Sequence, residues 1–160
     1  LRTGPSHPRT LAPSHRPIVM PLSEFTLHRR VTFHEVDSAG IVHFSIYFRY
    51  MEEAEHALWR EAGLSIAARG ANVGFPRVSA GFDYHRPLRF EDEFDARIRI
   101  VSMREKSMRY VCTLTKGEEK IATGTVTVVC VSRGEDGVMK ARPLPPEIAA
   151  RFQVSAEAEA

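Results

Sequence analysis

Residues 45–62 repeat apolar side chains at the spacing of an α-helix and leave only a narrow polar stripe. One face of this predicted helix consists of Tyr47, Tyr50, Met51, Ala54, Leu58 and Ala62, and the polar stripe of Arg49, Glu53, His56 and Arg60. Ile46, Phe48, Ala57 and Trp59 widen the apolar arc. Ser45 fits the N-cap position, and Gly63 is a natural residue to end the helix. Such a helix must be covered on most sides, which favours a sheet wrapped around it.

Five segments alternate apolar and polar residues with the period of a β-strand. They are residues 25–36, 77–86, 94–103, 108–115 and 120–131. The last four are joined by short connections, and residues 116–119 form a tight hairpin turn. Residues 145–152 are expected to form a short terminal helix. This order predicts an α+β fold, in which an antiparallel five-stranded sheet wraps around one long central helix.

Length and composition bound the domain organisation. A chain of 160 residues predicts a single domain, placed here at residues 22–154, with a core that needs neither disulfides nor metals. Residues 1–21 contain five prolines and no acid. This composition predicts a flexible leader, interpreted as a cloning remnant or an upstream-read start in preference to a targeting segment. Residues 155–160 are expected to be a frayed tail.

Charge and cysteine usage narrow the class of function. A net charge of +2 is far from a nucleic-acid-binding signature, but it is compatible with an anionic small molecule. No run approaches the roughly 20 apolar residues of a membrane helix. Cys112 and Cys130 lie in strand-like runs without metal-ligand spacing, which predicts buried thiols in a reducing compartment. We expect a cytoplasmic protein with no metal site, nucleic-acid partner or membrane span.

A small-residue turn with one acid, Asp37-Ser38-Ala39-Gly40, precedes the predicted helix. A helix N-terminus offers unpaired backbone N–H groups and a partial positive charge of about half an elementary charge. A carboxylate beside it can therefore serve chemistry on a bound molecule. The residues alone favour a plainer interpretation, in which Asp37 only forms an Asx-turn.

The order of elements and three motifs resemble the hotdog-fold acyl-CoA thioesterases, in particular the branch of 4-hydroxybenzoyl-CoA thioesterase. The sharpest match covers Asp37–Val42, Tyr47 and residues 49–54, and weaker matches cover residues 74–76, 84–88 and 141–145. Together they span about residues 25–152. Three motifs in the same order and spacing are more specific for a family than one short motif. They say little about the substrate.

The resemblance implies an acyl-CoA thioesterase without a cofactor, since coenzyme A is part of the substrate. Asp37 would act as nucleophile or general base, and the backbone N–H of Phe44 would stabilise the oxyanion. His43 would bind substrate or act as an acid, or it is only a satisfied loop residue. Substrate contacts would come from Ile46 and Tyr47, and phosphate contacts from Arg104, Lys106 and Arg109. The basic residues also fit an ordinary charged turn.

The resemblance further implies a homodimer or a homotetramer, with active sites at the dimer interface. Ile41, His43, Phe44 and Ile46 stand at or near positions where many relatives carry more polar or different residues. This departure predicts an apolar or aromatic acyl group. The matched pair His85-Arg86 is expected to be structural.

Three alternatives remain open. A second hotdog branch uses a mid-helix carboxylate, for which Glu52 or Glu53 would qualify, although a solvated or interface role suits them better. A non-catalytic protein that binds acyl-CoA would share the same fold. A thioesterase acting on acyl carrier protein substrates would also share it.

Overall fold

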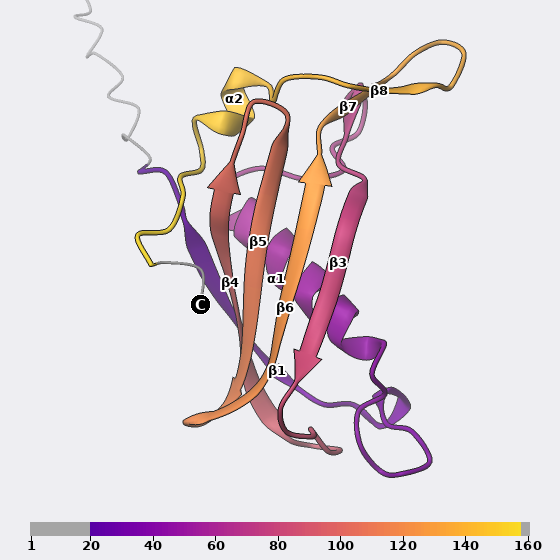
Figure 1. Ribbon diagram of the computed structural model, residues 1–160, viewed down its shortest axis with the longest axis vertical. Coiled ribbons are helices and arrows are strands. Elements are labelled where there is room, and N and C mark those ends of the chain that lie inside the picture. The colour runs from indigo at the N-terminus through magenta and orange to yellow at the C-terminus, as the bar shows by residue number, and fades with distance from the viewer. Residues whose placement is uncertain (1–19, 158–160) are drawn as a thin grey trace, which may run out of the picture.

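The computed structural model describes residues 20–157, in which a five-stranded antiparallel sheet packs on a long helix (Figure 1). The elements are β1 (Glu24–Arg30), η1 (Phe33–Glu35), α1 (Ile46–Glu61), β2 (Val73–Gly74), β3 (Arg77–Tyr84), β4 (Glu93–Met103), β5 (Ser107–Lys116), β6 (Glu119–Val129), β7 (Val131–Arg133), β8 (Met139–Ala141) and α2 (Pro146–Ala149). The sheet order is β1-β4-β5-β6-β3, so β1 and β3 are edge strands. The predicted α+β fold is confirmed. Residues 1–19 of the predicted leader lie outside the described residues.

The helix α1 crosses one face of the sheet diagonally, and the two layers share one core (Figure 1). Tyr50, Ala54, Leu58 and Trp59 are completely buried against the sheet. Trp59 also donates a hydrogen bond from Nε1 to the hydroxyl of Tyr110 at 3.1 Å. Burying one large apolar side chain contributes on the order of 2–3 kcal/mol, so packing of this face holds the helix in place.

Strands β4, β5 and β6 present one apolar row each to α1, as their alternation predicts. The buried rows are Ala96, Ile98 and Ile100; Met108, Tyr110, Cys112 and Leu114; and Ala122, Val126 and Val128. Both cysteines are free and buried. The turn between β5 and β6 forms at Gly117, whose φ of 59° is accessible to glycine.

The edge strand β3 departs from its predicted pattern. The alternation of residues 77–86 puts Val78 on one face with Phe82 and Tyr84. In the structure the register shifts between Arg77 and Ser79, and Val78 is 60% exposed. A β-bulge of this kind reorients the side chains on either side of it. Arg77 therefore turns toward the helix in place of Val78. Further along the strand, the ring of Phe82 packs against that of Phe48 on α1, with centroids 5.1 Å apart.

Strand β1 ends earlier than predicted. It stops at Arg30, and the segment expected to continue it to residue 36 forms the 3-10 turn η1. The carboxylate of Glu35 accepts the backbone N–H of Thr32 at 2.8 Å, which closes the turn instead of continuing the strand. Val31 still follows the alternation of Phe25 and Leu27 and is buried, but Phe33, which has the same parity, is 75% exposed. The apparent alternation is thus misleading beyond Val31.

The two ends of α1 are built differently. Gly63 follows the helix with a φ of 76° and donates its N–H to the carbonyl of Arg60 at 2.9 Å, which confirms its predicted role. Ser45 occupies the N-cap position, but its side chain makes no capping hydrogen bond. The Ser45 hydroxyl lies 2.8 Å from Nδ1 of His43 instead. The expected side-chain cap is therefore absent.

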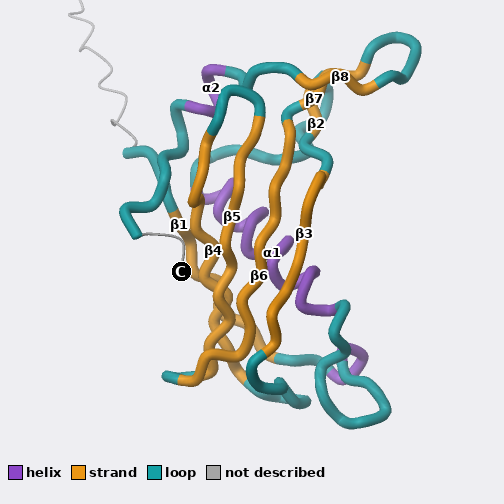
Figure 2. Tube along the Cα trace, in the orientation of Figure 1, coloured by secondary structure: helices purple, strands orange, loops and turns teal. Residues whose placement is uncertain are grey.

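A small second sheet of β2, β7 and β8 lies beyond one end of the main sheet (Figure 2). The turn-prone residues 133–137, which include two glycines, join β7 to β8. The helix α2 falls inside the predicted terminal helix but is shorter. Near the C-terminus, Ser155 donates its N–H to Ile100 at 2.8 Å, and Glu157 pairs with Arg97 at 2.7 Å.

Candidate active site

The loop between η1 and α1 carries Asp37. Val36 and Val42 pair across this loop in an antiparallel bridge, and the N–H of Asp37 donates to the carbonyl of Ile41 at 2.9 Å. Gly40 at the tip has a φ of 76°, which a residue with a Cβ rarely adopts. The loop is therefore a closed hairpin, and it fixes Asp37 beside the start of α1.

The carboxylate of Asp37 is half-buried and only partly engaged. Its Oδ1 accepts the backbone N–H of Ala39 at 2.8 Å, which is the Asx-turn that the plainer interpretation predicts. Within residues 20–157, Oδ2 has no hydrogen-bond or ion-pair partner. Asp37 can therefore form the turn and still react, because one carboxylate oxygen anchors the side chain and the other can take a proton or attack a carbon.

Asp37 lines a pocket of about 390 Å³ bounded by its loop, the start of α1 and the end of β3. The lining consists of Asp37, Ile41, Val42, Phe44, Tyr47, Tyr84, His85, Arg86 and Pro87. The rings of Tyr47 and Tyr84 meet edge to face with centroids 5.0 Å apart, and the Tyr84 hydroxyl donates to the carbonyl of Phe44 at 2.8 Å. The walls are thus mainly apolar and aromatic, apart from Asp37, His85 and Arg86.

The backbone N–H of Phe44 has no acceptor among the described residues. Its neighbours are engaged, since the N–H of Ser45 donates to Nδ1 of His43 and that of Ile46 to the carbonyl of His43. An unpaired N–H just before a helix can bind an oxygen that becomes anionic, because the helix dipole favours negative charge there. Phe44 and Asp37 line the same pocket.

His43 and Ile46 do not line this pocket. The ring of His43 bonds to Ser45 and lies 4.6 Å from the ring of Phe44, centroid to centroid. Ile46 packs against the core. Of the predicted residues around the reaction centre, the structure brings Asp37, Phe44 and Tyr47 together. His85 and Arg86, expected to be structural, join them in the lining.

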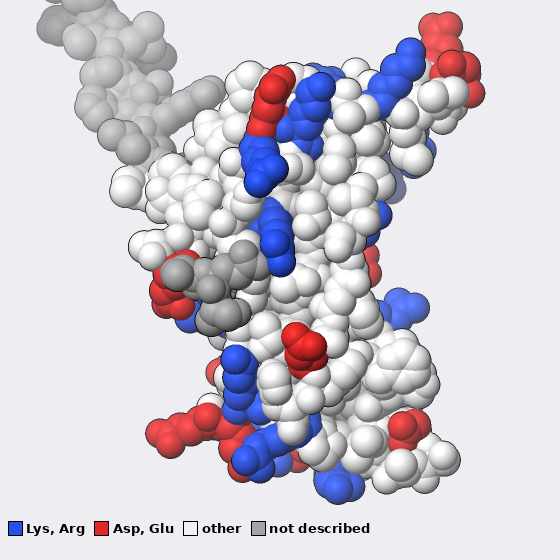
Figure 3. Space-filling model, in the orientation of Figure 1, with Lys and Arg blue, Asp and Glu red and all other residues white. Residues whose placement is uncertain are grey.

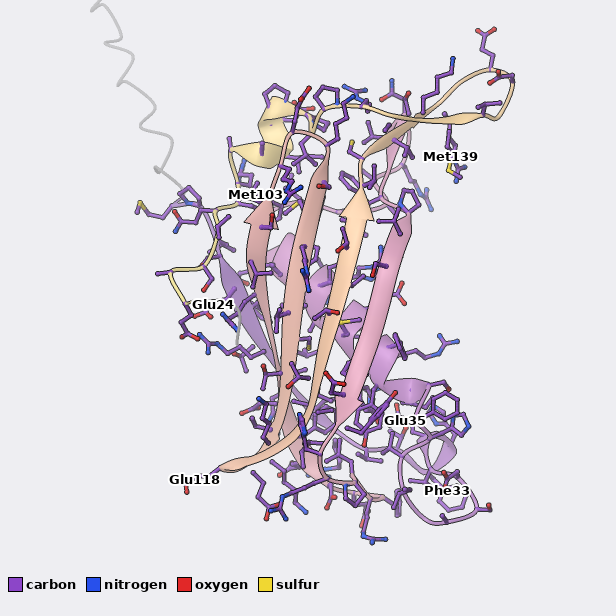
Figure 4. All side chains as sticks on the ribbon, in the orientation of Figure 1. Glu24, Phe33, Glu35, Met103, Glu118 and Met139 are labelled. Atoms are coloured by element: carbon purple, nitrogen blue, oxygen red, sulfur yellow. The ribbon has the colours of Figure 1, made fainter. Side chains whose placement is uncertain are left out.

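The predicted phosphate-binding residues lie at the other end of the sheet. Arg104 and Arg109 line a concavity of about 330 Å³ at the β4–β5 turn, and Lys106 is exposed in the same turn. Figure 3 shows basic side chains gathered over this end of the hairpin. In Figure 4 the labelled Met103 lies near this turn, far from the labelled Glu35 beside the Asp37 loop.

The strand register gives the scale of this separation. Tyr84 pairs with Ala122, which pairs with Leu114 on β5, whereas Arg109 pairs with Thr127. Leu114 and Arg109 are five residues apart on one strand. At about 3.3 Å per residue, the two levels differ by about 17 Å along the strand. Within one chain, the basic turn is therefore remote from the Asp37 pocket.

A buried network holds the Asp37 loop from the side of β1. The carboxylate of Glu35 accepts hydrogen bonds from Arg29, from the N–H of Thr32 and from the hydroxyl of Tyr50. Burial opposes ionisation, but these hydrogen bonds together lower the pKa of Glu35. Arg29 also pairs with Glu53 at 2.6 Å. Glu53, an alternative catalytic carboxylate, is thus engaged in an ion pair.

Sequence reasoning missed Glu55, which is completely buried in the middle of α1. One of its oxygens contacts the guanidinium of Arg77, and Oε1 has no partner among the described residues. Burial raises the pKa of Glu55 to about 7, against the opposing attraction of Arg77. A signal was present, because Met51, Glu55 and Leu58 share the helical apolar spacing.

Other groups offer less for catalysis. Glu52 is half exposed, 3.8 Å from Nε2 of His56 and 4.0 Å from Arg77. Burial raises the pKa of the Cys112 thiol to about 12, so this cysteine is not a ready nucleophile. Within residues 20–157, no cluster of three His, Cys, Asp or Glu side chains could hold a metal ion. No helix in that part of the chain is long and apolar enough to cross a membrane.

Comparison with known proteins places this arrangement in a family. The profile of the thioesterase-like superfamily matches residues 31–152, which is more than half of the chain. The 1,4-dihydroxy-2-naphthoyl-CoA hydrolase of Synechococcus elongatus is 23% identical over 140 residues, which cover 85% of this chain and 100% of that protein.

Solved structures agree with the fold. A gentisyl-coenzyme A thioesterase superposes with a TM-score of 0.72 at 28% identity, covering 81% of this chain and 100% of the other. A 1,4-dihydroxy-2-naphthoyl-CoA thioesterase from Synechocystis superposes with a TM-score of 0.74 at 22% identity, covering 81% and 95%. The chain belongs to the thioesterase-like superfamily. It is a hotdog-fold thioester hydrolase, and the predicted family resemblance is confirmed.

Proposed function

We propose that the protein hydrolyses an acyl- or aroyl-CoA thioester to the free acid and coenzyme A, with no cofactor of its own. One observation carries this proposal: a carboxylate oxygen of Asp37 and the backbone N–H of Phe44, neither of which has a partner within residues 20–157, belong to one pocket. The aromatic walls of that pocket favour an aromatic acyl group. The dihydroxynaphthoyl and gentisyl groups in the names of two relatives support the same class.

The chemistry follows from these two groups. The Phe44 N–H would donate to the thioester carbonyl oxygen as it becomes an oxyanion. Asp37 would either remove a proton from the attacking water or attack the carbonyl carbon itself, giving a mixed anhydride that water then hydrolyses. In both routes the carbon–sulfur bond breaks, the sulfur leaves with its electron pair, and it takes a proton to become the thiol of coenzyme A.

Release of the coenzyme A thiol tests this function directly. The wild-type protein should hydrolyse benzoyl-CoA, and Asp37→Asn should lower kcat by about a hundredfold or more, because a positioned base contributes that much. A panel of acyl-CoA and acyl carrier protein thioesters, measured in the same assay, shows which of the two carries the acyl group in the preferred substrate. Full activity of the Asp37→Asn variant, or preference for short polar acyl groups, would refute the assignment.

We also infer a homodimer in which each site draws on both chains. The edge strand β3 has unpaired backbone groups on one side and carries the exposed Val78. Antiparallel pairing of β3 with β3 of a second copy would reverse the strand direction across the junction. The β4–β5 turn of the second copy would then lie toward the Asp37 end of the first. Arg104, Lys106 and Arg109 would reach the phosphates of coenzyme A from there.

Complementation between two defective variants tests this arrangement. Asp37→Asn lacks the carboxylate, and the double variant Arg104→Glu/Lys106→Glu reverses two charges of the basic turn. If the turn acts across the dimer, a mixed dimer regains one intact site, and refolding the variants together restores activity. If both groups act within one chain, every site of the mixture is defective and activity stays low. Light scattering would establish the dimer or tetramer independently.

We also propose a cytoplasmic location, which different residues support. Cys112 and Cys130 are both free and both buried in the core. Unpaired thiols of this kind fit a reducing compartment, which supports a cytoplasmic location.

A further inference from the structure

Two basic side chains line the Asp37 pocket on a firmly held backbone. His85 and Arg86 directly follow β3, and the backbone N–H of each donates to the carbonyl of Ile121, at 2.8 Å and 3.0 Å. The segment is then anchored on its other side, because the carbonyl of the buried Leu88 accepts the N–H of Val42 at 2.8 Å. The pocket therefore receives its basic groups from a fixed position.

Neither basic side chain is neutralised by another residue of the described range. Elsewhere at this end of the sheet, Lys116 pairs with Asp92 and Arg30 pairs with Glu93, each at 2.7 Å. Within residues 20–157, the side chains of His85 and Arg86 make no hydrogen bond or ion pair, and that includes Asp37 across the pocket. A guanidinium without a counter-ion, at the wall of a pocket, favours a ligand that brings an anionic oxygen.

The position of these groups indicates which part of a CoA thioester they meet. The reacting carbonyl must lie beside Asp37, and the long pantetheine arm carries the phosphates well away from that carbon. Side chains that line the same pocket of about 390 Å³ are therefore within reach of the acyl group. The remaining walls, formed by Ile41, Phe44, Tyr47 and Tyr84, suit the apolar body of such a group.

We propose that Arg86, assisted by His85, binds an acidic oxygen on the acyl group, so that the preferred substrates carry a carboxylate or an acidic phenol there. The inference rests on the proposed thioesterase function and deepens it. It makes Arg86 a residue that determines specificity, in place of the structural role expected from the sequence. The bidentate geometry of arginine suits a carboxylate best, and a phenolic oxygen would accept a single hydrogen bond.

The test compares three thioesters of one size class: benzoyl-CoA, 4-hydroxybenzoyl-CoA and 4-carboxybenzoyl-CoA. In Arg86→Met, the ratio of kcat/KM for a substituted substrate to that for benzoyl-CoA should fall about tenfold or more, the size expected for a charged hydrogen bond. If the ratio falls further for 4-carboxybenzoyl-CoA, Arg86 recognises a carboxylate. If it falls further for 4-hydroxybenzoyl-CoA, Arg86 recognises a phenolic oxygen. Arg86→Lys keeps the charge and should retain part of the ratio. Arg89→Met, an exposed arginine outside the pocket lining, is the matched control and should leave the ratio unchanged.

The outcomes separate this inference from the function on which it rests. An equal loss on all three substrates would place Arg86 on a part common to every CoA thioester and overturn the inference, as would an unchanged ratio. Both results leave the thioesterase function standing, provided that wild type is active and Asp37→Asn is not. If the wild-type protein hydrolyses none of the three thioesters or the wider panel, the proposed function itself fails. Circular dichroism of each variant confirms that it is folded.

Discussion

Asp37 and Glu55 are two carboxylates, each with one oxygen that lacks a partner in the described part of the chain, yet their surroundings differ in almost every respect. Asp37 lies on a loop, half-buried, and lines a pocket of about 390 Å³ together with Phe44, whose N–H finds no acceptor in the same part of the chain. Glu55 lies inside α1, completely buried, and the adjoining cavity measures only about 130 Å³. Its nearest charged group is Arg77, which already occupies the other oxygen.

The difference shows that a perturbed pKa is not enough to identify a catalytic acid. Buried groups with shifted pKa values are common at active sites, and by that criterion Glu55 would be chosen. A thioester, however, needs space beside the carboxylate and a donor for the oxyanion. Only Asp37 has both. Glu55 is better understood as a group that joins the middle of α1 to the edge strand β3 through Arg77.

The strongest test of this comparison replaces each carboxylate separately and measures both activity and stability. Asp37→Asn should lower kcat by about a hundredfold or more with little change in melting temperature. Glu55→Gln should keep kcat within a few-fold and change the stability instead. Coenzyme A release and thermal unfolding, measured on the same samples, separate the two effects. If Glu55→Gln loses activity while remaining folded and Asp37→Asn does not, the assignment is reversed.

A third carboxylate sharpens the comparison, because Glu35 is buried like Glu55 but fully hydrogen-bonded. Glu35→Ala leaves the hydroxyl of Tyr50, the N–H of Thr32 and the charge of Arg29 without their acceptor. We expect the free energy of unfolding to fall by about 2–4 kcal/mol in urea titrations. The control is Glu53→Ala, which removes a partly exposed partner of the same Arg29 and should cost about 1 kcal/mol or less. Equal costs would show that burial of Glu35 contributes nothing.

The sequence predicted the layers of this fold because they depend on period alone. The helical repeat of residues 45–62 and the alternation in β4, β5 and β6 both record burial directly. The predictions fail where a single local interaction or an irregularity overrides the alternation of apolar and polar residues. Glu35 converts the end of the predicted first strand into η1, and the bulge at Val78 turns Arg77 inward. Neither event leaves a periodic signal.

The sequence could predict only the part of the candidate site that lies on the Asp37 loop and the start of the following helix. Asp37, Phe44 and Tyr47 all lie within residues 37–47, so one sequence motif can find them. His85 and Arg86 reach the same pocket from the end of β3, and only the sheet topology brings them there. The distance between this pocket and the basic turn at residues 104–109 depends on strand register, which no local pattern records.

The pH dependence of stability offers a smaller effect that separates Glu55 from Asp37. Since the folded-state pKa of Glu55 is about 7 and the unfolded value is near 4.5, the folded protein binds this proton more tightly. The free energy of unfolding should therefore fall as pH rises from about 4.5 to about 7, by roughly 2–3 kcal/mol, and then level off. Glu55→Gln should flatten this slope in urea titrations across the same range. An unchanged slope would mean that the ionised form of Glu55 is already paired well with Arg77.

The smallest expected effect concerns Ser45, and it tests how the Asp37 end of the molecule is built. A serine whose hydroxyl caps a helix typically contributes about 1 kcal/mol, and its replacement by alanine loses that amount. Here the hydroxyl bonds to Nδ1 of His43 at the surface and makes no capping bond, so Ser45→Ala should cost less than about 0.5 kcal/mol. Activity should also change little, because Ser45 does not line the pocket. A loss above 1 kcal/mol would show that the side chain caps α1 in solution.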